Sequence, residues 1–172
     1  VVNYGDESTC FPSTDPNCEV ALTDSDKTKL MDAITTQLRD FSTIADPERR
    51  ARCQEMKDTF LQLLNFDPPF VYRGGSDTPP SDPKPHFGAY VPSNSHMHFD
   101  PQYLNGTMSS STKWQVANTA LHEAAHALGA RHEGFDQQPH WVNTTKGNTP
   151  VYDATDDPYF VDLNPGGQSC MR

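Results

Sequence analysis

The chain has 172 residues, 34% of them hydrophobic, and its length suits one domain with a hydrophobic core. Its formal net charge is −10, and its 13 Lys and Arg residues form no cluster. This argues against a nucleic-acid or anionic-membrane partner, because both are bound through clustered basic side chains. No apolar run approaches the roughly 20 residues that span a bilayer, and no charged-then-apolar leader is present at Val1. We therefore expect a processed protein, and we take it to be a monomer.

The four cysteines, Cys10, Cys18, Cys53 and Cys170, include no C-x-x-C pair, which argues against a cysteine-based zinc or redox site. An even number spread along the chain fits two disulfides in an oxidising compartment, and hence a secreted protein. Of the three possible pairings we favour Cys10–Cys18, which closes a short Pro-rich loop, and Cys53–Cys170, which ties the C-terminus to an early helix. Free buried cysteines in a cytosolic protein are the alternative.

Two Asn-x-Ser/Thr tripeptides begin at Asn105 and Asn143. They are acceptors for N-linked glycans only in a protein of a eukaryotic secretory pathway. Such tripeptides are also common by chance, so the sequence alone assigns a glycan to neither.

Two helices are predicted after an irregular segment, 1–22. The first is capped by Thr23 or Asp24. Its apolar residues recur at helical spacing, namely Leu30, Ile34, Leu38 and Phe41. The second begins at Asp46-Pro47-Glu48, with proline at a tolerated first-turn position, and ends before Asp67-Pro68-Pro69. Its apolar face carries Met56, Phe60 and Leu63 or Leu64.

Short strands are expected at 70–72, 87–91 and 96–99, with a surface loop over 74–85 that has no periodic apolar face. A third, largely buried helix with several small residues follows over about 112–128. The rest of the chain has little periodicity, so we expect a metal ligand and a disulfide to hold it. The pattern predicts an α+β fold in a single domain, 1–172. Its N-terminal subdomain covers 1–129, and its irregular C-terminal subdomain covers 130–172.

The segment 122–132 reads HEAAHALGARH. His122 and His126 are four residues apart, so on a helix they lie one turn apart on the same side and can hold one zinc ion. Glu123 lies close to that metal without binding it and is the candidate general base. Gly129 ends the helix, so that the chain can return with His132 as the third ligand. Three neutral nitrogen ligands leave one position for water, as is typical of catalytic zinc.

The motif HExxHxxGxxH, matched at these five positions, resembles the extended signature of the metzincin clan of zinc peptidases. HExxH alone is a weak pattern, and the added glycine and histidine make it far more selective. The resemblance covers 11 residues and points to no one family within the clan. It implies three histidine ligands, a glutamate base, and a twisted mixed sheet with two long helices above an irregular C-terminal subdomain.

The resemblance also implies a Met-turn, in which a methionine lies beneath the zinc ligands. The only methionine after His132 is Met171, which we take as the candidate. Met171 is the penultimate residue, whereas metzincins usually continue into a C-terminal helix. The alternative is a methionine that merely lies next to a disulfide.

Four residues outside the motif have both a functional and a structural interpretation. His96 and His98 alternate onto one face of a strand that the resemblance places at the sheet edge, where an extended substrate can pair. We favour surface histidines, or histidines whose bonds are satisfied in the core, over a second metal site there. Tyr152 and Tyr159 are candidates for stabilising the oxyanion of a tetrahedral intermediate, and packed aromatic residues are the alternative.

The acidic tail offers a rival to His132, namely an aspartate as third ligand, as in the aspzincins. The candidates are Asp136, Asp153, Asp156, Asp157 and Asp162. The expected Gly-Thr-x-Asp signature of that group is absent, so we favour His132. Calcium binding by these carboxylates is less favoured than a solvated acidic loop, because no EF-hand-like spacing is present.

The sequence as a whole predicts a secreted zinc endopeptidase that acts on a peptide or protein substrate, with a metal-activated water and Glu123 as base. The alternative is a secreted zinc-binding protein or antigen on a zincin scaffold with little or no turnover. The presence of Glu123 argues against it, because metal binding alone does not require that carboxylate. A zinc-dependent toxin or a narrow processing peptidase is a third possibility.

Overall fold

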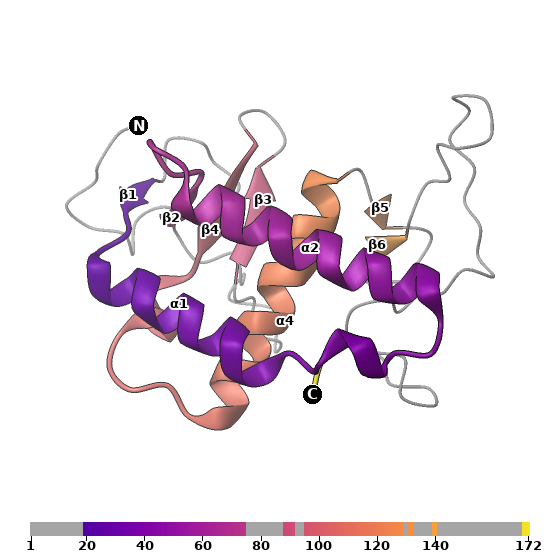
Figure 1. Ribbon diagram of the computed structural model, residues 1–172. Coiled ribbons are helices and arrows are strands. Elements are labelled where there is room, and N and C mark those ends of the chain that lie inside the picture. Colours follow the sequence, from indigo (N-terminus) through magenta and orange to yellow (C-terminus); the bar gives the residue numbers. More distant parts are fainter. Residues whose placement is uncertain (1–18, 75–87, 92–94, 129–130, 133–138, 141–169) are drawn as a thin grey trace.

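The computed structural model describes residues 19–74, 88–91, 95–128, 131–132, 139–140 and 170–172 (Figure 1). In this part of the chain the protein is α+β, as predicted, with a four-stranded mixed sheet and three long helices. The long helices are α1 (Asp24–Gln37), α2 (Pro47–Asn65) and α4 (Ser110–Ala127). The short helical elements are η2 (Phe41–Thr43) and α3 (Pro101–Leu104). Within the described residues, no helix is both long and apolar enough to cross a membrane.

The starts of the long helices follow from their capping residues. Thr23 caps α1, where its hydroxyl accepts from the Asp26 N–H and the Asp26 carboxylate accepts from the Thr23 N–H, which forms a capping box. Asp46 caps α2, with Pro47 in the first turn as predicted. Ser109 caps α4, so this helix begins two residues earlier than the predicted Thr112.

The first helix is shorter than its apolar spacing suggests. It ends at Gln37, because Leu38 has extended backbone (φ −81°, ψ 142°) and forms a β-bridge with Met171. Phe41 therefore lies outside the helix and begins η2. The apolar spacing extends beyond the end of α1 because Leu38 and Phe41 are also core residues, 5% and 8% exposed.

The sheet has the strand order β1 (Val20–Ala21), β2 (Val71–Arg73), β4 (His96–Phe99), β3 (Gly88–Val91). β2 and β4 are parallel, while β1 and β3 run antiparallel to their neighbours. β1 lies within the segment predicted to be irregular. The prediction that 96–99 forms the sheet edge is wrong, because β4 is paired on both sides. In the described sheet, β3 is the edge strand on that side.

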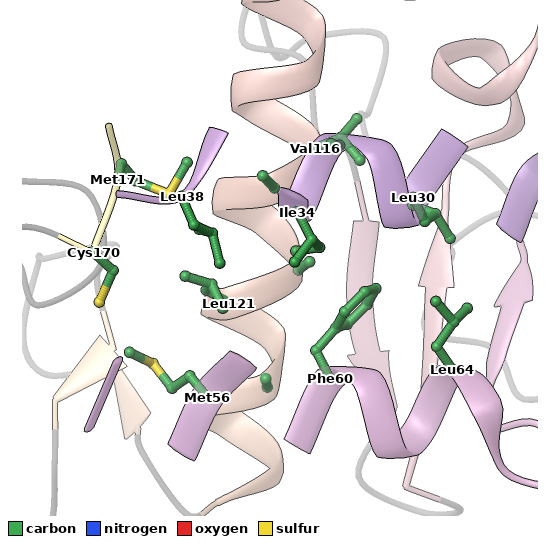
Figure 2. Close-up of a cluster of buried hydrophobic side chains, with 14 of the residues drawn as sticks. Leu30, Ile34, Leu38, Met56, Phe60, Leu64, Val116, Leu121, Cys170 and Met171 are labelled. Atoms are coloured by element: carbon green, nitrogen blue, oxygen red, sulfur yellow. The ribbon is translucent and has the colours of Figure 1, made fainter. Parts of the chain in front are cut away.

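One face of the sheet packs on the helices. Val71, Met97 and Phe99 point to that face and are at most 1% exposed. The Phe99 ring contacts the Phe60 ring of α2 edge to face, with 6.0 Å between centroids. Helix α4 packs against α1, α2 and β3, so it lies at the centre of the fold (Figure 1). Figure 2 shows side chains of α1, α2 and α4 meeting in one apolar core.

The C-terminus is held in this core. Cys170 forms the predicted disulfide with Cys53 of α2, with a Cα–Cα distance of 5.5 Å, and both cysteines are fully buried. The backbone continues the attachment: the Arg39 N–H donates to the Cys170 carbonyl at 3.1 Å, and the Arg172 N–H donates to the Gln37 carbonyl at 2.8 Å. Met171 packs beside Leu38, in the apolar cluster to which Leu121 of α4 also belongs (Figure 2). The Cys10–Cys18 pairing lies outside the described residues.

Candidate metal centre

Helix α4 carries His122, Glu123 and His126 in its last two turns. Its buried side consists largely of small residues, which allow the helix to approach its neighbours closely: Ala117, Ala120, Ala124 and Ala125. The helix ends at Leu128, whose N–H donates to the carbonyls of Ala124 and Ala125 at 3.0 and 3.1 Å. The close packing fixes the position of the three polar residues relative to the core.

The two imidazoles of this helix converge. Nε2 of His122 and Nε2 of His126 are 3.2 Å apart, and the rings meet edge to face with 4.9 Å between centroids. Two ligands of a tetrahedral zinc ion, each with a Zn–N bond of 2.0–2.1 Å, are separated by about 3.3 Å. Both histidines are half-buried. The geometry and the chemistry of this donor pair therefore fit a zinc ion.

Glu123 lies beside the pair in a buried position. It follows His122 directly and is only 8% exposed, although it carries a carboxylate. One step along a helix turns about 100°, so its side chain leaves the axis in a different direction from either imidazole. This is the placement expected of a carboxylate that acts near the metal without being one of its helical ligands.

The structure places only the backbone of the predicted third ligand. His132 lies in β5 (Arg131–His132), which pairs antiparallel with β6 (Pro139–His140), and β6 contacts α4. The strand β6 therefore lies against α4, and the role of His132 as third ligand stays a prediction. Among the described side chains, which do not include that of His132, no three His, Cys, Asp or Glu residues form a group suited to a metal.

Several other predicted site residues lie outside the described part of the chain. They are Gly129, the two tyrosines Tyr152 and Tyr159, and the rival ligands Asp136, Asp153, Asp156, Asp157 and Asp162. Met171 is described, and it lies in the core next to Leu38. Its role as a Met-turn beneath the histidines stays a prediction.

A second polar cluster lies on the sheet face opposite the helices. The carboxylate oxygen Oε1 of Glu19 lies 2.5 Å from Nδ1 of His96 and 3.1 Å from Nε2 of His98. Glu19 is 1% exposed and His98 is fully buried. One acid thus contacts both rings, so the two histidines have a partner within the fold rather than lying free on the surface. We call these three residues the carboxylate clasp.

The surroundings of the clasp are closely fitted. A Cβ atom on Gly74 would lie 2.7 Å from Cβ of His98, so a larger residue would displace the histidine. The Tyr72 ring lies 4.8 Å from the His96 ring. Burial, and secondarily the negative charge of Glu19, raise the pKa of Tyr72 above its ordinary value of 10.0. Sequence reasoning missed Glu19, because only the pairing of β1 with β2 brings it near β4.

Comparison with known proteins gives no match: no protein-family model fits the chain, and no curated protein or solved structure is significantly similar to it.

Proposed function

We propose that this protein is a secreted, zinc-dependent endopeptidase of the metzincin type. His122, His126 and His132 would hold the metal, and Glu123 would act as general base. The observation that carries the proposal is the 3.2 Å separation of the two Nε2 atoms on α4. That separation suits two ligands of one tetrahedral zinc ion, and the HExxHxxGxxH motif supplies the third ligand and the base.

The chemistry follows from the residues of α4. Zinc, when bound, would polarise the scissile carbonyl and make water acidic enough to ionise near neutral pH. Glu123 would accept a proton from the attacking water and deliver it to the leaving amine as the peptide bond breaks. Its burial keeps the carboxylate away from bulk solvent, so the proton passes between water, acid and amine rather than escaping.

The sheet offers a place for an extended substrate. β3 is the edge strand of the described sheet beside β4, and it packs against α4, the helix that carries the motif. An extended peptide can add to such an edge through backbone hydrogen bonds. We therefore propose that β3, and not the strand 96–99 expected from the sequence, aligns the substrate.

The decisive experiment is the substitution Glu123→Gln in the full chain. The amide keeps the size of the side chain but cannot act as a base, so peptidase activity should fall by about 10²–10⁴-fold. Zinc content, measured by plasma mass spectrometry, should stay near one ion per chain. Glu48→Gln, which changes an exposed acid in the first turn of α2, is the matched control and should leave both values unchanged.

Two results would overturn the proposal in different ways. A wild-type protein that binds zinc but cleaves neither a broad peptide library nor intact secreted proteins would be the zinc-binding protein or antigen of the alternative hypothesis. A wild-type protein that binds no zinc would remove the metal centre itself. Cleavage limited to one intact protein would identify a narrow processing peptidase or toxin.

The third ligand is tested separately. His132→Ala should reduce zinc content and activity together, whereas Asp157→Asn should leave zinc bound. The opposite result would favour an aspartate of the tail and the aspzincin arrangement.

A further inference from the structure

The turn between α3 and α4 carries the tripeptide Asn105-Gly106-Thr107, and all three residues are exposed. Asn105 ends α3 with extended backbone (φ −80°, ψ 141°), and its N–H donates to the Pro101 carbonyl at 3.0 Å. Gly106 has φ +70°, and a Cβ atom built there would have no neighbour within 4 Å. The turn therefore faces open solvent, with room for a bulky substituent.

The Asn105 side chain is oriented by a charged partner. Its Oδ1 atom accepts a hydrogen bond from Nη2 of Arg73 at 2.7 Å, and Arg73 also lies 3.6 Å from the Asp26 carboxylate. Guanidinium groups only donate, so the atom that faces Arg73 must be the amide oxygen. The amide nitrogen Nδ2, the atom that carries a glycan, makes no hydrogen bond with any described residue.

We propose that Asn105 is an N-glycan attachment site. The tripeptide satisfies the Asn-x-Thr acceptor rule, and the fully buried Cys53–Cys170 disulfide fits a chain that matures in an oxidising secretory compartment. This inference does not depend on the proposed peptidase activity. The second tripeptide, at Asn143, lies outside the described residues and carries no part of the argument.

Attachment of the glycan to Asn105 is a group transfer in which one bond forms and one bond breaks. Nδ2 of Asn105 forms a bond to the anomeric carbon of a lipid-diphosphate-linked oligosaccharide, and the bond from that carbon to the phosphate oxygen breaks. The lipid diphosphate leaves with the bonding electrons, and Nδ2 loses one of its two protons. Oδ1 is unchanged, so the hydrogen bond from Arg73 is compatible with the attached glycan.

The glycan would lie far from the metal centre. Asn105 precedes the first turn of α4, whereas His122 lies twelve residues after Ser110, about 18 Å along the helix axis. We therefore expect the glycan to leave zinc content and peptidase activity unchanged.

The test uses the full chain secreted from insect cells as the Asn143→Gln variant, so that Asn105 is the remaining acceptor. Treatment with peptide N-glycosidase in ¹⁸O water, followed by peptide mapping, should find Asn105 converted to labelled aspartate in most molecules. Thr107→Ser keeps the acceptor rule and should retain the modification. Thr107→Ala leaves Asn105 in place but should lose the modification.

Two outcomes would overturn the proposal. One is an unmodified Asn105 in secreted protein from a host that glycosylates a reference protein in the same culture. The other is a Thr107→Ala protein in which the label that depends on the glycosidase, measured against an untreated sample, is as large as in the protein with Thr107. Asn105→Asp is a second variant whose circular dichroism and disulfide content confirm that loss of the label is not loss of folding.

Discussion

The protein contains two pairs of histidines whose spacing in the sequence places each pair on one face of its element. The two pairs contact different groups in the structure. On α4, His122 and His126 are half-buried, and their Nε2 atoms face each other at 3.2 Å. On β4, His96 and His98 both reach one oxygen of Glu19. The difference shows that spacing alone does not determine what a histidine pair contacts. The nitrogens of the α4 pair converge on each other, whereas those of the β4 pair converge on a buried acid.

The largest expected effect is a difference in zinc content between variants of the two histidine pairs. His126→Asn removes one ligand of the proposed centre, so zinc should fall from about one ion per chain to nearly none, with activity reduced more than about 10²-fold. His96→Asn removes one partner of Glu19 and should leave zinc bound. The measurement is plasma mass spectrometry after dialysis, with peptide cleavage in parallel. Equal loss of zinc in both variants would place the strand pair in the metal centre.

Removal of the Cys53–Cys170 disulfide should affect the proposed metal centre on α4 more than the carboxylate clasp. Cys53 and Cys170 are 117 residues apart, so the double variant Cys53→Ala/Cys170→Ala should lose about 2–5 kcal/mol of unfolding free energy. It also removes the covalent attachment of the segment that carries His132 and leaves the backbone hydrogen bonds, so zinc affinity should weaken. Urea denaturation and chelator competition measure the two effects. Unchanged zinc affinity in a destabilised variant would show that the ligands are held without this attachment.

The features predicted correctly depend on residues close together in the chain. Thr23 and Asp46 cap their helices because a side-chain oxygen can reach a backbone N–H two or three residues away. The convergence of His122 and His126 is likewise set within one helical turn. Local chemistry of this kind can be read from a sequence.

The features that were missed depend on contacts between distant segments. Leu38 leaves helix α1 because it pairs with Met171, at the other end of the chain. β4 is an interior strand because β3 returns antiparallel beside it, which no periodicity in 96–99 indicates. Glu19 resembles any surface acid until β1 is known to pair with β2. The Cys53–Cys170 bridge also joins distant segments, but it was predicted correctly, because a cysteine has few possible partners in this chain.

A smaller effect should come from the acid of the clasp. Glu19→Gln keeps the size of the side chain but replaces a charged acceptor that two histidines share, so stability should fall by about 1–3 kcal/mol. The control is Glu55→Gln, which removes an exposed ion pair with Arg52 and should cost at most about 1 kcal/mol. Urea denaturation measures both. A Glu19→Gln protein that is as stable as the control would mean that the clasp contributes little to folding.

The smallest expected effect is a pH dependence on the clasp side of the sheet. Because the pKa of Tyr72 is raised in the folded protein, its phenol stays protonated at pH values where the unfolded chain has already ionised. The unfolded state then binds fewer protons, so this stabilising contribution is complete below about pH 10 and is lost as the pH rises through the folded pKa.

Tyr72→Phe should therefore flatten the alkaline loss of stability, measured as the urea midpoint between about pH 9 and about pH 11. Tyr103 provides the comparison on another element, since its pKa is also raised, first by burial and then by the charge of Asp100. In Glu19→Gln protein, the loss of stability at alkaline pH that is due to Tyr72 should become smaller without vanishing, because burial is the main cause of the raised pKa. The loss that is due to Tyr103 should not change. An equal response of both tyrosines to Glu19→Gln would show that the charge of Glu19 acts on the whole molecule rather than on Tyr72 alone.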